Sequence, residues 1–450
     1  MLKRLLLALP IVLMPNMLHV DVNTGIPGLN IANIIVILLA IALLVWRRGP
    51  APDPGMGMIT PPLLLLFLML TTGFVVSQFS PQNGLLDDLT YYKNAIFYPL
   101  LYFIYRRCRQ DLAGTRQLII LVMVVAAVAG VEAIREGLDY GIGHYSDTHR
   151  ASGPFGYDYR NANRAGVFYA MFLPMFVAMA LFFRNQRVWR LAAIAGIGIL
   201  AMAIMVTYSR QSYFIALAAC ALLLMRRNVV LAVLIGLCAI PAVALLPESV
   251  TQRVAETEQR NAVGAEELDT STASRFEIWD GAIRMWEEHP IGVGLGRFQA
   301  NIGRYVPRYA GYDAHNGYIR ILAELGPIGT LAMFWILWRA LRLGLALKRT
   351  ARRDDAEATA IAYGFSVLAI ATGLGNLYGS PFFEGSVMAN FWILCGLVEH
   401  YMLLKRQETS VEASPLDTDL KATASPIGQR FPLAGRIAPG RYGQDGSSWE

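Results

Sequence analysis

The sequence predicts an all-α integral membrane protein with about twelve transmembrane helices. Of its 450 residues, 55% are hydrophobic and only 16% are charged. An average soluble domain is about 45–50% apolar and about 25% charged, and a soluble protein as apolar as this one would lack the polar groups to cover its surface. One membrane helix needs about 20 mostly apolar residues, so the apolar supply suits about twelve spans. The composition excludes a soluble enzyme, a disordered chain, a secreted disulfide scaffold and a coiled coil.

Twelve apolar runs follow one another along the chain, and we expect a helix at each. They lie at about 5–20, 29–46, 59–78, 92–105, 117–135, 161–183, 189–207, 211–225, 228–246, 317–346, 358–378 and 385–404. The first run is short and contains Pro10 and Pro15, so it could be mistaken for a signal peptide. It has no convincing small-residue cleavage site and a second span follows closely, so we interpret it as a membrane helix.

The basic residues alternate between loops and predict the orientation. If the N-terminus with Lys3 and Arg4 is cytoplasmic, every second loop should be basic. The loops on that side contain Arg47, Arg48, Arg106, Arg107, Arg109, Arg184, Arg187, Arg190, Arg226, Arg227, Lys348, Arg349, Arg352, Arg353, Lys405 and Arg406. On the opposite side, the stretch 21–28 has no basic residue, and the only charged residues of 79–88 are Asp87 and Asp88. Twelve spans with both termini in the cytoplasm preserve this alternation, and the net charge of +6 then implies no nucleic-acid partner.

The chain divides into a polytopic membrane domain, residues 1–406, and a tail, residues 407–450. Two outer loops of the membrane domain are large, at about 136–160 and 247–316, and the second precedes the last three helices. Long loops between spans are often functional. The tail is rich in Ser, Pro, Gly and Asp, so we expect a disordered cytoplasmic segment.

Arginine is the only basic residue type in the large outer loop. The loop contains Arg253, Arg260, Arg275, Arg284, Arg297, Arg304 and Arg308, and no lysine. For most of them, a solvated loop with surface ion pairs is the ordinary interpretation. The exclusive use of arginine nevertheless indicates phosphate binding as a second interpretation, because the planar guanidinium binds phosphate oxygens bidentately and stays charged.

Two further side chains stand out at the outer ends of spans. Arg210 lies in a tight turn, 207–212, between two apolar runs, where a charge is costly and usually functional, unless it only reaches for lipid headgroups. His315 follows Asp313, which we expect to be the N-cap of the tenth span. His315 would then lie in the first helical turn, where the helix dipole favours the neutral imidazole and makes it a candidate general base. The alternative is a polar interfacial residue without a chemical role.

The glycine-rich stretch 289–298 invites comparison with a phosphate-binding loop. It follows no convincing strand and lies on the outer side, so we interpret it as a tight turn. The four cysteines, Cys108, Cys220, Cys238 and Cys395, have no metal-ligand spacing, and no acidic metal cluster or H-E-x-x-H motif occurs. The sequence therefore calls for no cofactor and no metal.

Several short segments, in this order, resemble the O-antigen ligase and O-antigen polymerase superfamily of bacterial membrane proteins. They are Arg150-Ala-Ser-Gly-Pro-Phe-Gly156, Tyr208-Ser-Arg210, Ser274-Arg-Phe-Glu-Ile-Trp279, His289-Pro-Ile-Gly-Val-Gly-Leu-Gly-Arg-Phe298, and His315-Asn-Gly-Tyr318 followed by Glu324-Leu-Gly326. Each segment is short, but the ordered set, with a large loop before the last three helices, is fairly specific. The resemblance covers roughly residues 145–400.

The resemblance implies a GT-C-like fold in the bacterial inner membrane and a glycosyltransferase of lipopolysaccharide biosynthesis. Such enzymes move a glycan from an undecaprenyl pyrophosphate carrier to an acceptor hydroxyl, here lipid A core, at the periplasmic face. The reaction inverts the anomeric centre and needs no metal. The essential histidine of the superfamily falls on His315 and its paired arginines on Arg210 and Arg275. Arg150 and Asn163 match a weaker substrate-binding signature, with a longer spacing than usual.

Other functions remain open at this point. Within the superfamily, the acceptor could be another lipid-linked repeat, as for a polysaccharide polymerase, or a protein, as for an O-oligosaccharyltransferase. The compact chain weakly favours the ligase. A polytopic transporter would place charged residues near the middle of the membrane and use paired broken helices. A structural scaffold would leave Arg210 and His315 dispensable.

Overall fold

The structure of the chain is a computed structural model. It describes residues 2–17, 31–45, 55–80, 84–141, 146, 149–156, 161–183, 186–230, 232–234, 258–260, 266–268, 270–352 and 354–412. Most of the predicted ninth span, 228–246, and residues 247–257 of the large loop lie outside the described residues.

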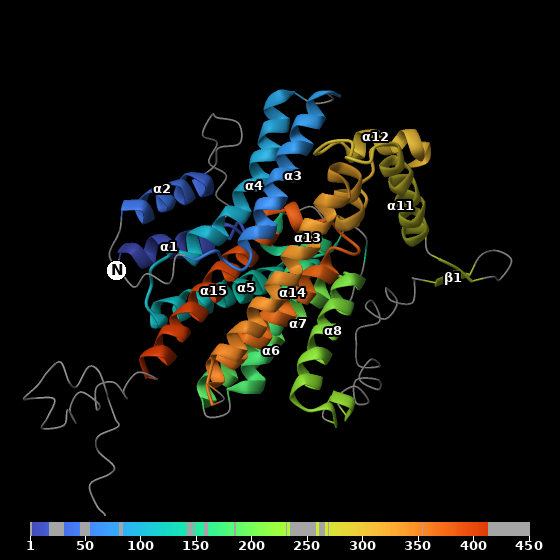
Figure 1. Cartoon of the computed structure of the whole chain (residues 1–450). Helices are drawn as coiled ribbons and strands as arrows, with labels where there is room; N and C mark the ends of the chain where they lie inside the picture. The colour runs from blue at the N-terminus through green and yellow to red at the C-terminus, as the bar shows by residue number, and fades with distance from the viewer. Residues whose placement is uncertain are drawn as a thin grey trace, which may run out of the picture. The chain divides into compact units, whose positions relative to one another are not determined.

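Helices dominate the described residues, as the sequence predicts (Figure 1). They are α1 (Leu2–Leu13), α2 (Ile31–Val45), α3 (Thr60–Gln78), α4 (Leu85–Arg106), α5 (Leu112–Tyr140), α6 (Ala162–Phe182), α7 (Arg187–Val206), α8 (Arg210–Arg227), α11 (Thr270–Glu288), α12 (Phe298–Tyr305), α13 (Gly317–Thr350), α14 (Ala356–Gly375) and α15 (Gly385–Glu412). Three-residue 3₁₀ helices occur at Gly153–Phe155, Pro307–Tyr309 and Pro381–Phe383. Between residues 247 and 316, β1 (Glu258–Arg260) pairs antiparallel with β2 (Glu266–Leu268).

Seven of the described helices are long and apolar enough to cross a membrane: α3, α5, α6, α7, α13, α14 and α15. The remaining described helices do not meet both conditions, so the total of twelve spans stays a prediction. At the C-terminus, α15 ends at Glu412, so residues 407–412 are helical rather than part of the predicted tail. Residues 413–450 lie outside the described residues.

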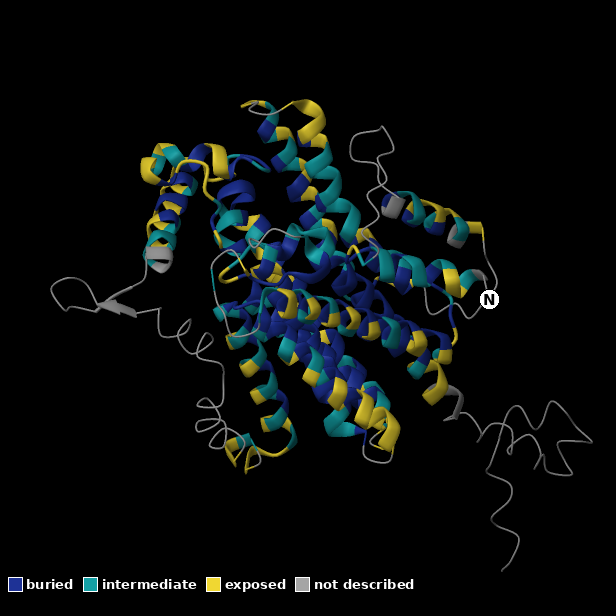
Figure 2. Ribbon diagram, turned by 180° about the vertical axis from the view of Figure 1, so that it is seen from behind, coloured by how far each residue is buried: buried dark blue, intermediate teal, exposed yellow. Residues whose placement is uncertain are grey.

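The core of the bundle is built around α6 and α14, which pack against each other. Figure 2 shows the buried residues gathered in the centre of the bundle. In α6, 83% of the most apolar window is buried within the protein, compared with only 28% in α7. The close approach depends on Gly364, where a Cβ atom would lie 3.0 Å from the Cα atom of Met175. Large apolar side chains of α7, including Val188 and Leu191, are exposed. Since lipid is the natural solvent for such side chains, α7 lies at the periphery of the bundle.

One end of the bundle gathers several helix ends that are distant in sequence. The N–H group of Gly317, at the start of α13, donates to the carbonyls of Asn376 and Gly379, just after α14. At the start of α8, the side-chain amide of Gln211 donates to the carbonyl of Gly375 at the end of α14, over 2.7 Å. These contacts place the starts of α8 and α13 beside the end of α14.

Candidate functional site

A polar cavity of about 1130 Å³ opens at this end of the bundle. Its walls come from α4, the start of α6, the segment before α13 and the segment between α14 and α15. The charged or amide side chains that line it include Arg150, Asn163, Arg164, Asp313, His315 and Arg320. The cavity therefore brings together three of the five residues that the sequence singled out, namely His315, Arg150 and Asn163.

His315 lies two residues before α13 in a left-handed backbone conformation, with φ of +47°. Its N–H group donates to the carboxylate of Asp313 over 3.2 Å. The N-cap of α13 is Asn316, whose side-chain oxygen accepts from the N–H groups of Tyr318 and Ile319. The expectation that Asp313 caps the helix and that His315 lies in its first turn is therefore wrong.

The position of the helix start has a packing cause. Asn and Asp are equally good N-cap residues, so the local sequence alone does not choose between Asp313 and Asn316. The choice follows from Gly317, whose N–H group is bound to the segment after α14. A Cβ atom at this position would lie 2.6 Å from the side-chain oxygen of Asn376, so a larger residue would require the Asn376 side chain to move.

The surroundings of His315 favour its neutral form. Desolvation lowers the pKa of His315 below its ordinary value, and the nearby guanidinium groups of Arg275 and Arg164 lower it further, while Asp313 opposes them. The side chain is still 48% exposed, so a substrate can reach it. The imidazole at the cavity wall is thus neutral at pH 7 and able to accept a proton.

Arg320, in the first turn of α13, binds three partners and joins the histidine segment to α4. It forms an ion pair with Asp313 over 3.3 Å, and it donates to the hydroxyl of Tyr91 in α4 over 2.8 Å. It also pairs with Glu324, one turn further along α13. Arg320 was not among the residues predicted from the sequence. The available signal was an Arg–Glu pair at i,i+4 inside the apolar run 317–346, where charges are costly and paired.

Arg150 and Asn163 form a hydrogen bond of 2.6 Å at the cavity wall. The Nε atom of Arg150 also donates to the carbonyl of Thr207 over 3.0 Å, and its Nη2 atom donates to the carbonyl of Tyr208. Arg150 is buried. It therefore fixes the turn between α7 and α8 against the start of α6.

Arg210 directly follows the turn between α7 and α8 to which Arg150 is hydrogen-bonded. Tyr208 has φ of +49°, which is unusual for a bulky residue and marks a strained turn. Arg210 is the first residue of α8, directly before Gln211, which lines the cavity. The structure thus places Arg210 beside the cavity, although it is not among the lining residues.

Arg275 reaches the same region from α11. Its guanidinium lies 5.5 Å from the ring centroid of Tyr378, a cavity-lining residue. The position of α11 is fixed by Trp279, whose indole N–H group donates to the carbonyl of Ala314 over 2.8 Å. Because Ala314 directly precedes His315, α11 and the histidine segment are held together.

The glycine-rich stretch 289–298 is a tight turn, as the sequence predicts. Its N–H groups at Val293 and Gly294 donate to the carbonyls of Ala323 and Glu324 in α13, over 2.9 and 3.1 Å. This contact lies beside a break in α13 at Gly326, where φ is +71°. The stretch therefore joins the outer loop to the helix that carries the histidine segment.

Gly294→Ala should lower the melting temperature of the protein more than Gly311→Ala. Both glycines have positive φ, +100° and +80°, so alanine is strained at either position by about 1–2 kcal/mol. A Cβ atom on Gly294 would in addition lie 2.7 Å from the backbone of Ser77, whereas at Gly311 it meets no atom within 4 Å. Thermal unfolding in detergent measures the difference, and equal melting temperatures would contradict this packing argument.

Arg297 is an exception to the solvated-loop interpretation of the outer arginines. It is fully buried and forms a bidentate ion pair with Asp88 at the start of α4, with Nη1–Oδ1 at 2.8 Å. Its Nη2 atom also donates to the carbonyl of Ser77. The pair ties the glycine-rich stretch to the α3–α4 hairpin.

Within the described residues, no group of three or more His, Cys, Asp or Glu side chains is arranged to hold a metal ion. Cys108, Cys220 and Cys395 are free thiols, and Cys238 lies outside the described residues.

Residues 195–334 match the family model described as O-antigen ligase. The matched span includes Arg210, Arg275 and His315, and ends within α13. This match confirms the resemblance to the O-antigen ligase and polymerase superfamily. No curated protein matches the chain.

Proposed function

From the relationship to the O-antigen ligase superfamily, we propose that this protein transfers a glycan from undecaprenyl pyrophosphate to an acceptor hydroxyl of lipid A core. The reaction inverts the anomeric centre and needs no metal. The observation that carries the proposal is the position of His315 at the wall of a large polar cavity, where desolvation and the charge of Arg275 lower its pKa.

His315 accepts the proton of the acceptor hydroxyl as the oxygen attacks the anomeric carbon. Its lowered pKa supports this role, because a general base must be unprotonated at the working pH. The leaving pyrophosphate gains negative charge as the glycosidic bond breaks. Arg210 and Arg275 stabilise that charge, since fixed guanidinium groups bind phosphate oxygens bidentately.

Arg150 and Asn163 shape the wall against which the substrate lies. Because the guanidinium of Arg150 already donates to three protein oxygens, its part in substrate binding is to hold Asn163 and the Arg210 turn in place. The cavity volume exceeds the range of about 300–1000 Å³ that is common for small ligands, which supports a substrate of several sugar units.

We assign the cavity to the periplasmic side of the inner membrane and both termini to the cytoplasm. The opposite helix ends are basic, with Arg226 and Arg227 at the end of α8 and Lys348 and Arg349 at the end of α13. Basic ends favour the cytoplasm. The lipid-linked donor glycan is presented on the periplasmic side, which is the side to which we assign the cavity.

The acceptor is tested by offering one purified lipid-linked donor to lipid A core, to a second lipid-linked glycan and to a pilin-like protein. Transfer to lipid A core alone supports the ligase. Transfer to the second glycan or to the protein instead identifies a polymerase or a protein O-oligosaccharyltransferase. No transfer to any of the three would reject the proposed reaction, and transfer that EDTA abolishes would reject its metal independence.

The acid limb of the pH–rate profile should report on His315. In the unmodified protein, kcat/KM should fall as pH drops through a value below 6.5, because the pKa of His315 is lowered. Arg164→Gln removes a positive neighbour, so it should move the limb to higher pH. Asp313→Asn removes the negative neighbour, so it should move the limb to lower pH. If the acid limbs of the two variants shift in the same direction, or if neither shifts, His315 is not the titrating base.

Arg210→Lys and Arg275→Lys should each lose most of the transfer activity although the charge is kept. Lysine cannot replace the planar fork of arginine on a pyrophosphate, and losing one such stabilising group costs about 10²–10³ in kcat. Arg308→Lys is the matched control, because Arg308 is exposed in the same loop and its guanidinium lies over Tyr309 instead. Activities of Arg210→Lys and Arg275→Lys equal to that of the control would exclude pyrophosphate binding by these arginines.

A further inference from the structure

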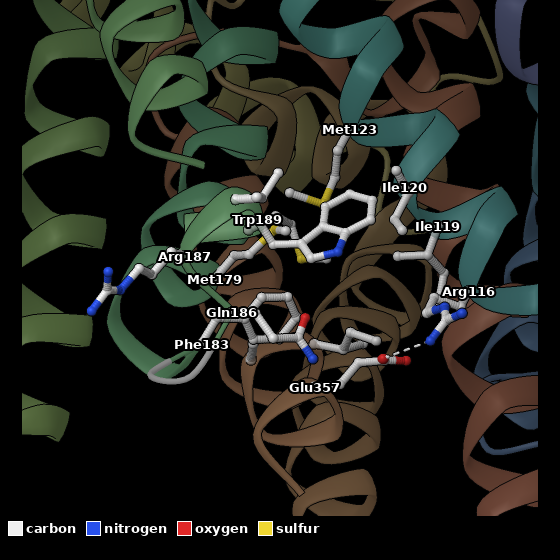
Figure 3. A pocket seen from close by; sticks show the side chains of 14 residues that line it. Arg116, Ile119, Ile120, Met123, Met179, Phe183, Gln186, Arg187, Trp189 and Glu357 are labelled. Carbon is white, nitrogen blue, oxygen red and sulfur yellow. Dashed lines mark hydrogen bonds and ion pairs between the residues drawn. The ribbon is translucent and has the colours of Figure 1, made fainter. Parts of the chain in front are cut away.

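A second cavity, of about 640 Å³, lies at the opposite end of the bundle from the candidate site. It is enclosed by the starts of α5, α7 and α14 and by the end of α6 (Figure 3). Its walls are mainly apolar and contain Ile119, Ile120, Met123, Met175, Met179, Phe183, Val188, Trp189, Ala360 and Ile361. None of these residues takes part in the chemistry proposed above.

The cavity lies toward the starts of α5 and α7, whereas the two helices approach each other closely toward their other ends. There, glycines of α5 let the helices meet: a Cβ atom on Gly137 would lie 2.8 Å from the side chain of Val206, and one on Gly130 would lie 3.1 Å from Ile199. Toward the cavity, larger side chains such as Met123 and Trp189 form the walls instead (Figure 3). The two helices therefore leave a space that side chains do not fill.

The rim of this cavity carries an excess of positive charge. Arg116 forms an ion pair with Glu357 over 3.2 Å, and Arg187 extends outward from the opposite side, away from the apolar walls (Figure 3). The rim thus carries two guanidinium groups and one carboxylate, and only Arg116 is paired with that carboxylate among these three. Trp189 lies between the two guanidinium groups, and Trp is enriched at the depth where membrane meets water.

We propose that this cavity binds an anionic phospholipid, with one acyl chain against the apolar walls and the phosphate at the arginine rim. An acyl chain gains by leaving water for such walls. The phosphate would lie where Arg187 extends, and basic pockets between membrane helices on the cytoplasmic side are known to take anionic headgroups. This proposal is independent of the transfer reaction.

The test is lipid binding by the purified full-length protein in a neutral detergent, followed by native mass spectrometry. Phosphatidylglycerol and phosphatidylcholine with the same chains are titrated separately. Phosphatidylglycerol should bind one saturable site with higher affinity. Arg187→Gln should weaken that binding about fivefold, which corresponds to about 1 kcal/mol for a basic residue near a lipid surface. Arg190→Gln is the matched control, since Arg190 is exposed nearby and does not line the cavity.

A cavity-filling variant tests the location. Ile120→Trp places an indole in the cavity and should abolish saturable binding. Ile194→Trp makes the same change on the exposed face of α7 and should not. Three results would overturn the proposal. They are equal affinity for the two lipids, unchanged binding by Ile120→Trp, and displacement of phosphatidylglycerol by a polyprenyl phosphate but by no other phospholipid. If Ile120→Trp does not fold, equal binding by Arg187→Gln and Arg190→Gln overturns it.

Discussion

His315→Asn should reduce glycan transfer about 10²–10⁴-fold, the usual contribution of a general base. Asparagine is the replacement of choice, because His315 has φ of +47° and asparagine tolerates this left-handed conformation better than alanine. The backbone hydrogen bond to Asp313 is retained, so the segment before α13 keeps its shape. The measurement is the rate of transfer from a purified lipid-linked donor.

His289→Asn is the matched control for this variant. His289 is exposed at the end of α11 and does not line the cavity, so its replacement should leave transfer unchanged. Melting temperatures of both variants close to that of the unmodified protein would show that they fold. Undiminished transfer by a folded His315→Asn protein would remove His315 from the mechanism.

Arg297→Met should destabilise the protein by about 3–5 kcal/mol, because it leaves the carboxylate of Asp88 buried without its guanidinium partner. The bond from Arg297 to the carbonyl of Ser77 is lost as well. A methionine fills part of the space, so the effect reports the uncompensated charge more than a cavity. The melting temperature in detergent measures the loss.

A double variant separates the charge from the packing. Asp88→Leu combined with Arg297→Met removes both charges, and such apolar replacements are often neutral or stabilising. The double variant should therefore melt at a higher temperature than Arg297→Met alone. Arg308→Met, at an exposed position of the same loop, should change little. If the double variant is less stable than Arg297→Met, the interactions of the ion pair contribute more to stability than the desolvation of its two charges costs.

The helices were predictable because they depend on local apolar runs. The apolar run at 161–183 corresponds to α6, most of the run at 358–378 lies in α14, and the run at 385–404 lies within α15. The glycine-rich turn was also predictable, since three glycines within five residues favour positive φ. His315 stood out as an imidazole at a span boundary, and the structure places it at the cavity.

The rest depended on partners far away in the sequence. Nothing near Arg297 indicates that it pairs with Asp88, which lies 209 residues earlier. Likewise, the choice of Asn316 over Asp313 as N-cap follows from the contact of Gly317 with the segment after α14. Local patterns predict elements well, but they do not predict which distant segment completes the hydrogen bonds of an element.

The break in α13 has a consequence for the dynamics of the outer loop. Pro327 has no N–H group, so the carbonyl of Ala323 loses its normal helical donor, and the N–H group of Val293 replaces it. Detachment of the glycine-rich stretch would leave that carbonyl without this partner inside the protein, where Ala323 is fully buried, and an unpaired buried carbonyl is costly. The amide hydrogens of Val293 and Gly294 should therefore exchange with solvent as slowly as those in the interior of α13, in a single cooperative opening unit.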